Sequence, residues 1–217
     1  MPEGDTIHRT ARTLHRALAG RVVTRFESVY PRLTRVDADA PLCGRTIERV
    51  EARGKHVLMW FSVRLKPDPT TDAPLILRTH MRMQGSWHIY RPGERWQRPR
   101  HDMRIVIETD VIHAIAFNVP VAELGTATEI ERGPVLSALG PDVLSDDFDA
   151  AEGVHRVSER AAMSIADALL DQSAIAGIGN IYKCEALFAA KVHPFAAVAS
   201  LPPDTIARVV ATAVKMM

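Results

Sequence analysis

The sequence predicts an α+β protein in which an antiparallel β-sheet domain with a leading helix precedes an all-α domain. Three observations support this fold class. Apolar residues near the N-terminus repeat at helical spacing, several short β-like segments then follow with turns between them, and strand-like alternation stops after residue 132. We therefore predict two domains, residues 1–132 and 133–217.

The leading helix is predicted over residues 6–19. Asp5 or Thr6 is a candidate N-cap, and Gly20 ends the helical pattern. The apolar positions that follow the helical period are Ile7, Ala11, Leu14 and Leu18. One face of this helix is therefore expected to be buried.

The β-like segments that follow are short and are separated by turns. They cover residues 21–29, 45–51, 56–63, 75–79, 86–90, 104–109 and 111–117. Such a series is typical of an antiparallel sandwich or barrel, and both architectures stay open at this point. The polar, proline-rich piece at residues 66–74 is predicted to be a loop insertion between two strands.

The second domain opens with a linker and continues as helices. Gly133, Pro134, Gly140 and Pro141 mark the linker. The predicted helices cover residues 158–170, 180–190 and 203–217. The last helix keeps its apolar face to the final residue, with no cap or polar tail, so we expect a truncated chain or a fragment.

Composition excludes several classes of protein. With 47% hydrophobic and 24% charged residues the chain is globular, and its first twenty residues carry charges throughout, which excludes a signal peptide. No apolar run reaches membrane-spanning length. Cys43 and Cys184 are far apart and the histidines lack zinc-like spacing, so we predict no metal site and a reduced, cytoplasmic setting. The basic segment 91–104 is either a solvated loop or a phosphate contact.

The N-terminus carries the first candidate for chemistry, in the letters MPEGDT. Removal of Met1 would leave Pro2 with a free secondary amine, and an α-amino group titrates at about 7.7–8.0. Amines attack aldehydic carbons to form Schiff bases, and Glu3 or Asp5 is a candidate for the acid that assists. The alternative is a disordered start followed by a helix cap.

Two glycine-containing turns are candidate phosphate contacts. Gly179 and Asn180 lie in the turn GIGN directly before a predicted helix, whose first amides are unpaired donors. Alternatively, this turn is a simple helix–turn–helix corner with Asn180 as N-cap. Lys55 lies in the turn RGK before an apolar strand, where a solvated lysine is equally compatible with the pattern.

The stretch THMRMQGSWH places His80, Arg82 and Met83 in a predicted loop. Methionines near a turn either fill the core or supply an apolar wedge that enters a base stack. In the second interpretation Arg82 faces a phosphate or an orphaned base.

Together these blocks resemble a known family. The letters PEG, RGKH, THMRMQGSWH and DQSAIAGIGNIYKCEALF occur in the order found in the formamidopyrimidine-DNA glycosylase/endonuclease VIII family. The resemblance covers essentially the whole chain and is strongest to the bacterial endonuclease VIII type that begins PEGDT. It implies an N-terminal β-sandwich and a helix–two-turn–helix domain.

The resemblance also implies an activity. A bifunctional DNA glycosylase/AP lyase of base excision repair would remove oxidised bases, pyrimidines above all, and cut the strand by β-elimination. By position, Pro2 would form the Schiff base, Glu3 would be the acid, and Lys55 would contact phosphate and assist elimination. The residues implied in DNA binding are Asn180, Gly179, His80, Arg82 and Met83. The alternative is a non-catalytic protein that recognises damaged or unusual DNA structure.

Three departures from the family pattern accompany the resemblance. Thr6 stands where many relatives carry a second glutamate, and the arginine–phenylalanine wedge of the formamidopyrimidine branch is not recognisable in residues 113–124. The family's C-terminal zinc finger is absent, so no cofactor is expected in this chain. We expect damaged double-stranded DNA as the partner, no membrane association, a monomer, and a bacterial cytoplasmic, nucleoid-associated location.

Overall fold

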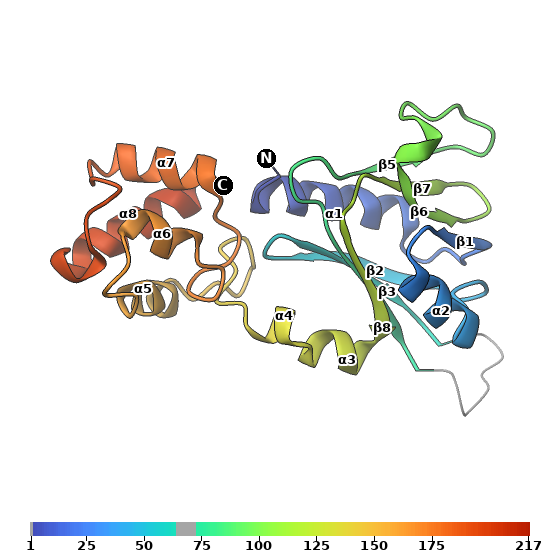
Figure 1. Ribbon diagram of the computed structural model, residues 1–217, viewed down its shortest axis with the longest axis horizontal. Helices are drawn as coiled ribbons and strands as arrows, with labels where there is room; N and C mark the ends of the chain where they lie inside the picture. The colour runs from blue at the N-terminus through green and yellow to red at the C-terminus, as the bar shows by residue number, and fades with distance from the viewer. Residues whose placement is uncertain (1, 64–72) are drawn as a thin grey trace. The chain divides into compact units, whose positions relative to one another are not determined.

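The computed structural model describes residues 2–63 and 73–217 (Figure 1). Contacts divide the chain into two compact units. The sandwich unit contains Pro2, His8–Ala52 and His56–Gly133, whereas the helical unit contains Glu3–Ile7, Arg53–Lys55 and Pro134–Met217. Two short pieces of the N-terminal half, both carrying candidate site residues, thus belong to the helical unit.

The sandwich unit is built from two four-stranded sheets. The first has the order β1-β6-β7-β5, with bounds Arg25–Ser28, Met103–Glu108, His113–Phe117 and Ser86–Tyr90. The second has the order β2-β3-β4-β8, with bounds Ile47–Arg53, His56–Phe61, Leu75–His80 and Val121–Thr126. The registered pairs β1–β6, β6–β7, β5–β7, β3–β4 and β4–β8 are antiparallel. The predicted antiparallel sandwich is confirmed.

The predicted leading helix is α1, Gly4–Leu18. The four apolar residues that define its period are all buried, which confirms its apolar face. Strand β3 is buried along its whole length, and this explains its unbroken apolar sequence HVLMWF. Because this central strand is covered on both faces, it has no exposed face on which polar residues would alternate with apolar ones.

Some sequence expectations were incomplete or wrong. Strand β8 and helix α2, Pro31–Asp39, were not predicted, although Pro31 at the first helical turn is a usual start signal. The helix expected over residues 158–170 is wrong, because α5, Ala150–Ser158, ends there and α6, Ile165–Leu170, begins anew. Separate N-caps at Asp149 and Ser164 start the two helices. The loop predicted at residues 66–74 lies mostly outside the described residues.

The helical unit contains four main helices around one apolar core (Figure 1). Besides α5 and α6 these are α7, Asn180–Ala189, and α8, Pro203–Met216. Helix α8 packs against both α5 and α7. Shorter elements are α3, Ala127–Arg132, in the sandwich unit, α4, Pro134–Ser137, and the 3-10 turns Arg100–Asp102 and Val198–Ser200.

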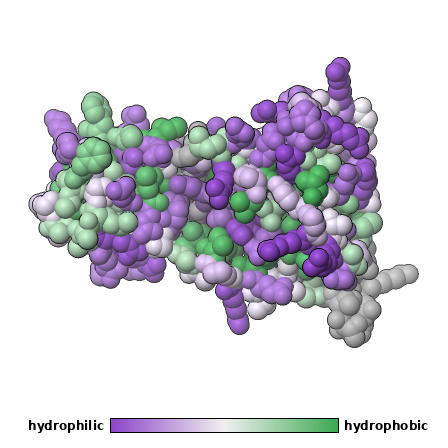
Figure 2. Space-filling model, viewed as in Figure 1, coloured by the Kyte–Doolittle hydropathy of each residue, from purple (hydrophilic) through white to green (hydrophobic). Residues whose placement is uncertain are grey.

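The helical unit also exposes apolar side chains. Figure 2 shows hydrophobic residues in green among hydrophilic ones on the visible face of this unit. The exposed large side chains here include Ile181, Phe188 and Phe195. In the part of the chain that the structure describes, no helix is both long and apolar enough to cross a membrane.

Candidate active site

The carboxylate of Glu3 is held at the start of α7. Its Oε1 accepts a hydrogen bond from the backbone N–H of Ile181 at 2.7 Å, and Oε2 accepts one from Tyr182 at 3.2 Å. The first amides of a helix have no partner within the helix and carry its positive dipole, so an anion is stabilised there. Glu3 is only 1% exposed. An acidic group is thus fixed in place by backbone donors.

Gly179 makes room for this carboxylate. A Cβ at this position would lie 2.4 Å from the carboxyl carbon of Glu3 and 2.7 Å from its Oε1. Those distances are far below van der Waals contact, so any side chain at residue 179 would displace Glu3. Gly179, rather than Asn180, is also the N-cap of α7, which excludes the interpretation of Asn180 as the cap.

Gly4 and Gly177 join the N-terminus to the glycine turn that precedes α7. The N–H of Gly4 donates to the carbonyl of Gly177 at 3.0 Å. A Cβ on Gly4 would meet that oxygen at 3.0 Å, and Gly177 has φ +101°, a conformation that favours glycine. The PEG and GIGN motifs, which are far apart in the sequence, are therefore complementary parts of one structure.

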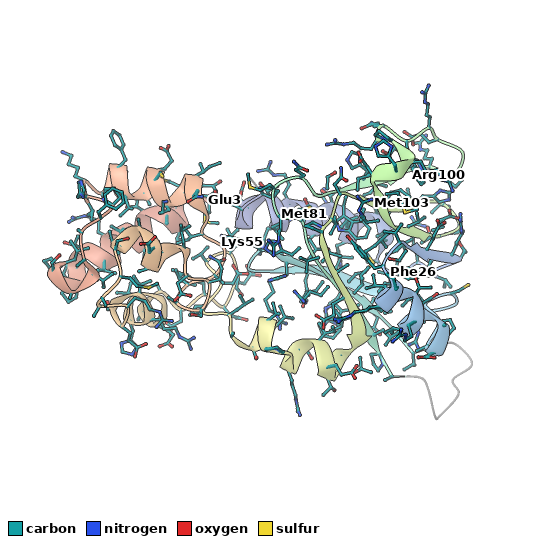
Figure 3. The ribbon with its side chains drawn as sticks, viewed as in Figure 1. Glu3, Phe26, Lys55, Met81, Arg100 and Met103 are labelled. Atoms are coloured by element: carbon teal, nitrogen blue, oxygen red, sulfur yellow. The ribbon has the colours of Figure 1, made fainter. Side chains whose placement is uncertain are left out.

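The turn that precedes Lys55 holds it near the Glu3 carboxylate, whose charge acts on it. Gly54 has φ +57° and donates its N–H to Oδ2 of Asp142 at 2.6 Å, while Oδ1 of Asp142 accepts from Leu144 at 3.1 Å. Burial lowers the pKa of Lys55, and the negative charge of Glu3 raises it in part. Both Lys55 and Glu3, which Figure 3 labels, belong to the helical unit by their contacts.

Asn180 is the first residue of α7 and is exposed. Its Oδ1 accepts from the ammonium of Lys183, one turn later, at 2.9 Å. An amide and a cation thus lie side by side at a helix start. This combination suits a phosphate group, because the helix dipole and the lysine both favour an anion.

Pro2 is covalently bonded to Glu3 and is partly buried. With Met1 removed, its nitrogen is an amine one residue from the fixed carboxylate. Thr6 donates its hydroxyl to Oδ1 of Asp5 at 3.2 Å.

The stretch THMRMQGSWH contains the end of β4, a tight turn over residues 81–85 and the start of β5, all in the sandwich unit. His80 is the last residue of β4 rather than a loop residue, and the N–H of Gly85 donates to the carbonyl of Met81. The two methionines differ: Met81 is 2% exposed and fills the core, whereas Met83 is 66% exposed. Between them, Arg82 has φ +49°. Only Met83 is available as a wedge.

The sequence interpretation missed two residues that organise the helical part of the site. Asp142 was not among the predicted site residues, yet it holds the turn before Lys55. Gln172 bridges the glycine turn: its amide nitrogen donates to the carbonyl of Ile178 at 3.1 Å, and its Oε1 accepts from Gly177 at 3.1 Å. A polar residue beside a glycine-rich turn was the available signal for Gln172.

The structure thus brings together Glu3, Lys55, Gly179 and Asn180 in the helical unit, and His80, Arg82 and Met83 in one turn of the sandwich unit. Among residues 2–63 and 73–217, no three His, Cys, Asp or Glu side chains converge as a metal site. The predicted absence of a metal remains a prediction.

Solved structures share this fold. A complex of the wild-type Lactococcus lactis Fpg (MutM) with DNA containing N7-benzyl-Fapy-dG superposes with a TM-score of 0.80. It covers 99% of this chain and 77% of that chain at 22% identity. A second structure, of MutM with DNA containing carbocyclic 8-oxo-G, has a TM-score of 0.81 at 21% identity and covers 99% of this chain and 78% of that one.

Sequence relatives define the family. The profile of the formamidopyrimidine-DNA glycosylase N-terminal domain matches residues 1–120, and that of the H2TH domain matches residues 139–217. "Probable endonuclease 8 2" of Streptomyces coelicolor is 38% identical over 100% of this chain and 73% of its own length. "DNA-(apurinic or apyrimidinic site) lyase Nei2" of Mycolicibacterium smegmatis is 33% identical over 93% of this chain and 71% of its own length. The chain belongs to the formamidopyrimidine-DNA glycosylase/endonuclease VIII family of base excision repair glycosylases and AP lyases.

Proposed function

We propose that this protein removes oxidised bases, preferentially pyrimidines, from damaged double-stranded DNA through a Schiff base on Pro2, and then cuts the strand by β-elimination. The observation that carries the proposal is the Glu3 carboxylate, which two α7 amides hold one residue from the candidate nucleophile. Site residues of the helical unit and of the exposed turn have the chemistry that the reaction requires.

The chemistry begins with attack of the Pro2 nitrogen on C1′ of the damaged nucleotide. The bond from C1′ to the base breaks, and the base leaves and takes a proton from water. Glu3 receives the proton that the Pro2 nitrogen releases and passes it to the sugar ring oxygen, so the ring opens and the Schiff base forms as an iminium ion, whose positive charge acidifies the C2′ proton. Loss of a C2′ proton then breaks the C3′–O bond and cuts the strand. Water hydrolyses the iminium ion and restores Pro2.

Lys55 suits two roles in this reaction. Its ammonium form attracts a DNA phosphate. Because burial lowers its pKa, its neutral amine form is more accessible near neutral pH than that of a solvated lysine, and this form can accept the C2′ proton.

The DNA contacts are assigned by chemistry in the same way. Asn180 and the α7 amides beside Gly179 suit the phosphates next to the lesion. The damaged base must leave the duplex before C1′ can be attacked, and exposed Met83, with Arg82 and His80 in the same turn, suits the space that it leaves. The preference for pyrimidines follows from the resemblance to the endonuclease VIII branch, and relatives named endonuclease 8 in Streptomyces coelicolor and Mycobacterium tuberculosis are similar to this chain.

The test is borohydride trapping on DNA that carries an abasic site, followed by mass mapping of the crosslinked peptide. The expected adduct is on Pro2, and Pro2→Gly should reduce trapping strongly while noncovalent binding is retained. Pro31→Gly, at the exposed start of α2 in the sandwich unit, is the matched control. Normal binding with no adduct would instead favour the non-catalytic DNA-binding protein.

A further inference from the structure

A side-chain network, buried at Arg78 and His56 and exposed at Glu123, crosses the sheet that carries the THMRMQGSWH turn. Arg78 on β4 donates from Nε and Nη2 to Oε2 of Glu123 on β8, at 3.0 and 2.6 Å. Its Nη1 lies 3.2 Å from Nδ1 of His56 on β3. Arg78 is 6% exposed and His56 is 8% exposed. Three neighbouring strands thus share one polar network in an otherwise apolar layer.

The network determines the protonation state of His56. A guanidinium can only donate, so Nδ1 of His56 must accept the bond from Arg78 and its single proton lies on Nε2. Burial, His80 and the positive charge of Arg78 lower the pKa of His56 to about 3. At physiological pH, His56 is therefore a neutral ring with one defined tautomer.

The ring of His56 packs against His80, which begins the exposed turn. Their ring centroids are 4.8 Å apart and their planes meet at 67°. His80 in turn accepts a hydrogen bond at Nδ1 from the backbone N–H of Arg82, at 3.1 Å. Arg82 has φ +49°, which a non-glycine residue adopts only with support from its surroundings. The bond from Arg82 to His80 is such a support.

We propose that His56 is a positioning residue for DNA binding: held by Arg78, which Glu123 anchors, it orients His80, and His80 holds the backbone of Arg82 so that Met83 projects from the sheet. This inference rests on the proposed function in one respect, the entry of Arg82 and Met83 into DNA. It assigns a role to the histidine of the RGKH motif, which the chemistry on Pro2 does not use.

The test is a double-mutant cycle on DNA with an abasic-site analogue that cannot react. His56→Asn keeps an acceptor for Arg78 but removes the ring that contacts His80. We expect His56→Asn to weaken binding about tenfold, the scale of one lost hydrogen bond in a site. With His80→Ala already present, His56→Asn should cause no further loss. His113→Asn, in the other sheet of the same unit, is the control.

A purely structural role for His56 predicts different results. Wild-type affinity of His56→Asn, or losses that multiply in the double variant, would overturn the proposal. On reactive abasic DNA, His56→Asn should raise KM while changing the rate of adduct formation at saturating DNA by less than about threefold. A fall in that rate with unchanged KM would also contradict positioning of the DNA-binding turn.

A second measurement uses only the wild-type protein, so it does not depend on whether a variant folds. In the wild-type protein, the amide proton of Arg82 should exchange with solvent more slowly than that of exposed Met83, because His80 accepts its hydrogen bond. Equal exchange of the two amides would overturn the proposal. Affinity and amide exchange do not require a Pro2 adduct, so failure of the catalytic assignment would be recognised separately, by the trapping experiment.

Discussion

The start of α7 and the exposed turn after β4 hold their functional side chains by different means. At α7, backbone amides bind the Glu3 carboxylate directly and glycine at 179 leaves the space for it. After β4, side chains of β8, β4 and β3 form one network. Its member His80 accepts the backbone N–H of Arg82 in the turn. A site held by backbone requires particular small residues, whereas a site held by side chains distributes its support.

The largest effect is expected from Gly179→Ala. The new methyl group would overlap Glu3, and misplacement of a catalytic group by about 1 Å costs about 100-fold in rate. We expect a loss of adduct formation of at least that size, measured by trapping. Gly153→Ala in α5, where the nearest atom would be 3.3 Å away on Phe148, is the matched control. Near wild-type trapping by Gly179→Ala would show that the backbone-held site tolerates change.

Asp142→Ala should have the next largest effect. The amides of Gly54 and Leu144 would lose their acceptor, at a cost of about 1–3 kcal/mol in the free energy of unfolding. Because Gly54 precedes Lys55, adduct formation should also slow by about tenfold, which corresponds to 1.4 kcal/mol. Asp142→Asn keeps one acceptor oxygen and should be intermediate in both urea unfolding and trapping. Equal behaviour of the two variants would contradict this account.

His56 tests the side-chain network through pH. Its pKa is about 3 when folded and near 6.5 when unfolded, so between these values the unfolded chain binds more protons. The stability that His56 contributes is therefore present above pH 6.5 and is lost as the pH falls toward 3, at up to about 1.4 kcal/mol per pH unit.

Urea unfolding of the wild type and of His56→Asn from pH 7 to pH 4 measures the pH-dependent contribution of His56 to the free energy of unfolding. The stability of the wild type should fall more steeply with acid than that of the variant. Parallel pH profiles would mean that His56 already protonates in the folded protein.

Glu123→Gln should have the smallest effect. The side chain of Glu123 is 53% exposed, so its ion pair with Arg78 is screened and contributes less than about 1 kcal/mol. The change in the free energy of unfolding should shrink further in high salt. A loss well above this value would show that the outer end of the network is as important as its buried part.

The leading helix and most strands were predictable because their signals are local. The period of α1 and the alternation and turns around β5 are readable within a few residues. Strand β8 was missed because its sequence, VAELGT, contains little of the apolar alternation by which the other strands were recognised. The helix expected over residues 158–170 is wrong because apolar spacing alone does not show where a polar N-cap begins a helix, and here the caps Asp149 and Ser164 start two separate helices.

By itself the sequence determined the leading helix, most of the strands, the fold class, and the motifs that place this chain in its family. Only the tertiary structure showed that Glu3 lies on the amides of α7, that Gly179 must lack a side chain, and that Asp142 and His56 support residues far from them in sequence. The physical reason is that helical and strand periods depend on neighbouring residues, whereas a hydrogen bond or close contact across 178 positions depends on the folded path of the chain.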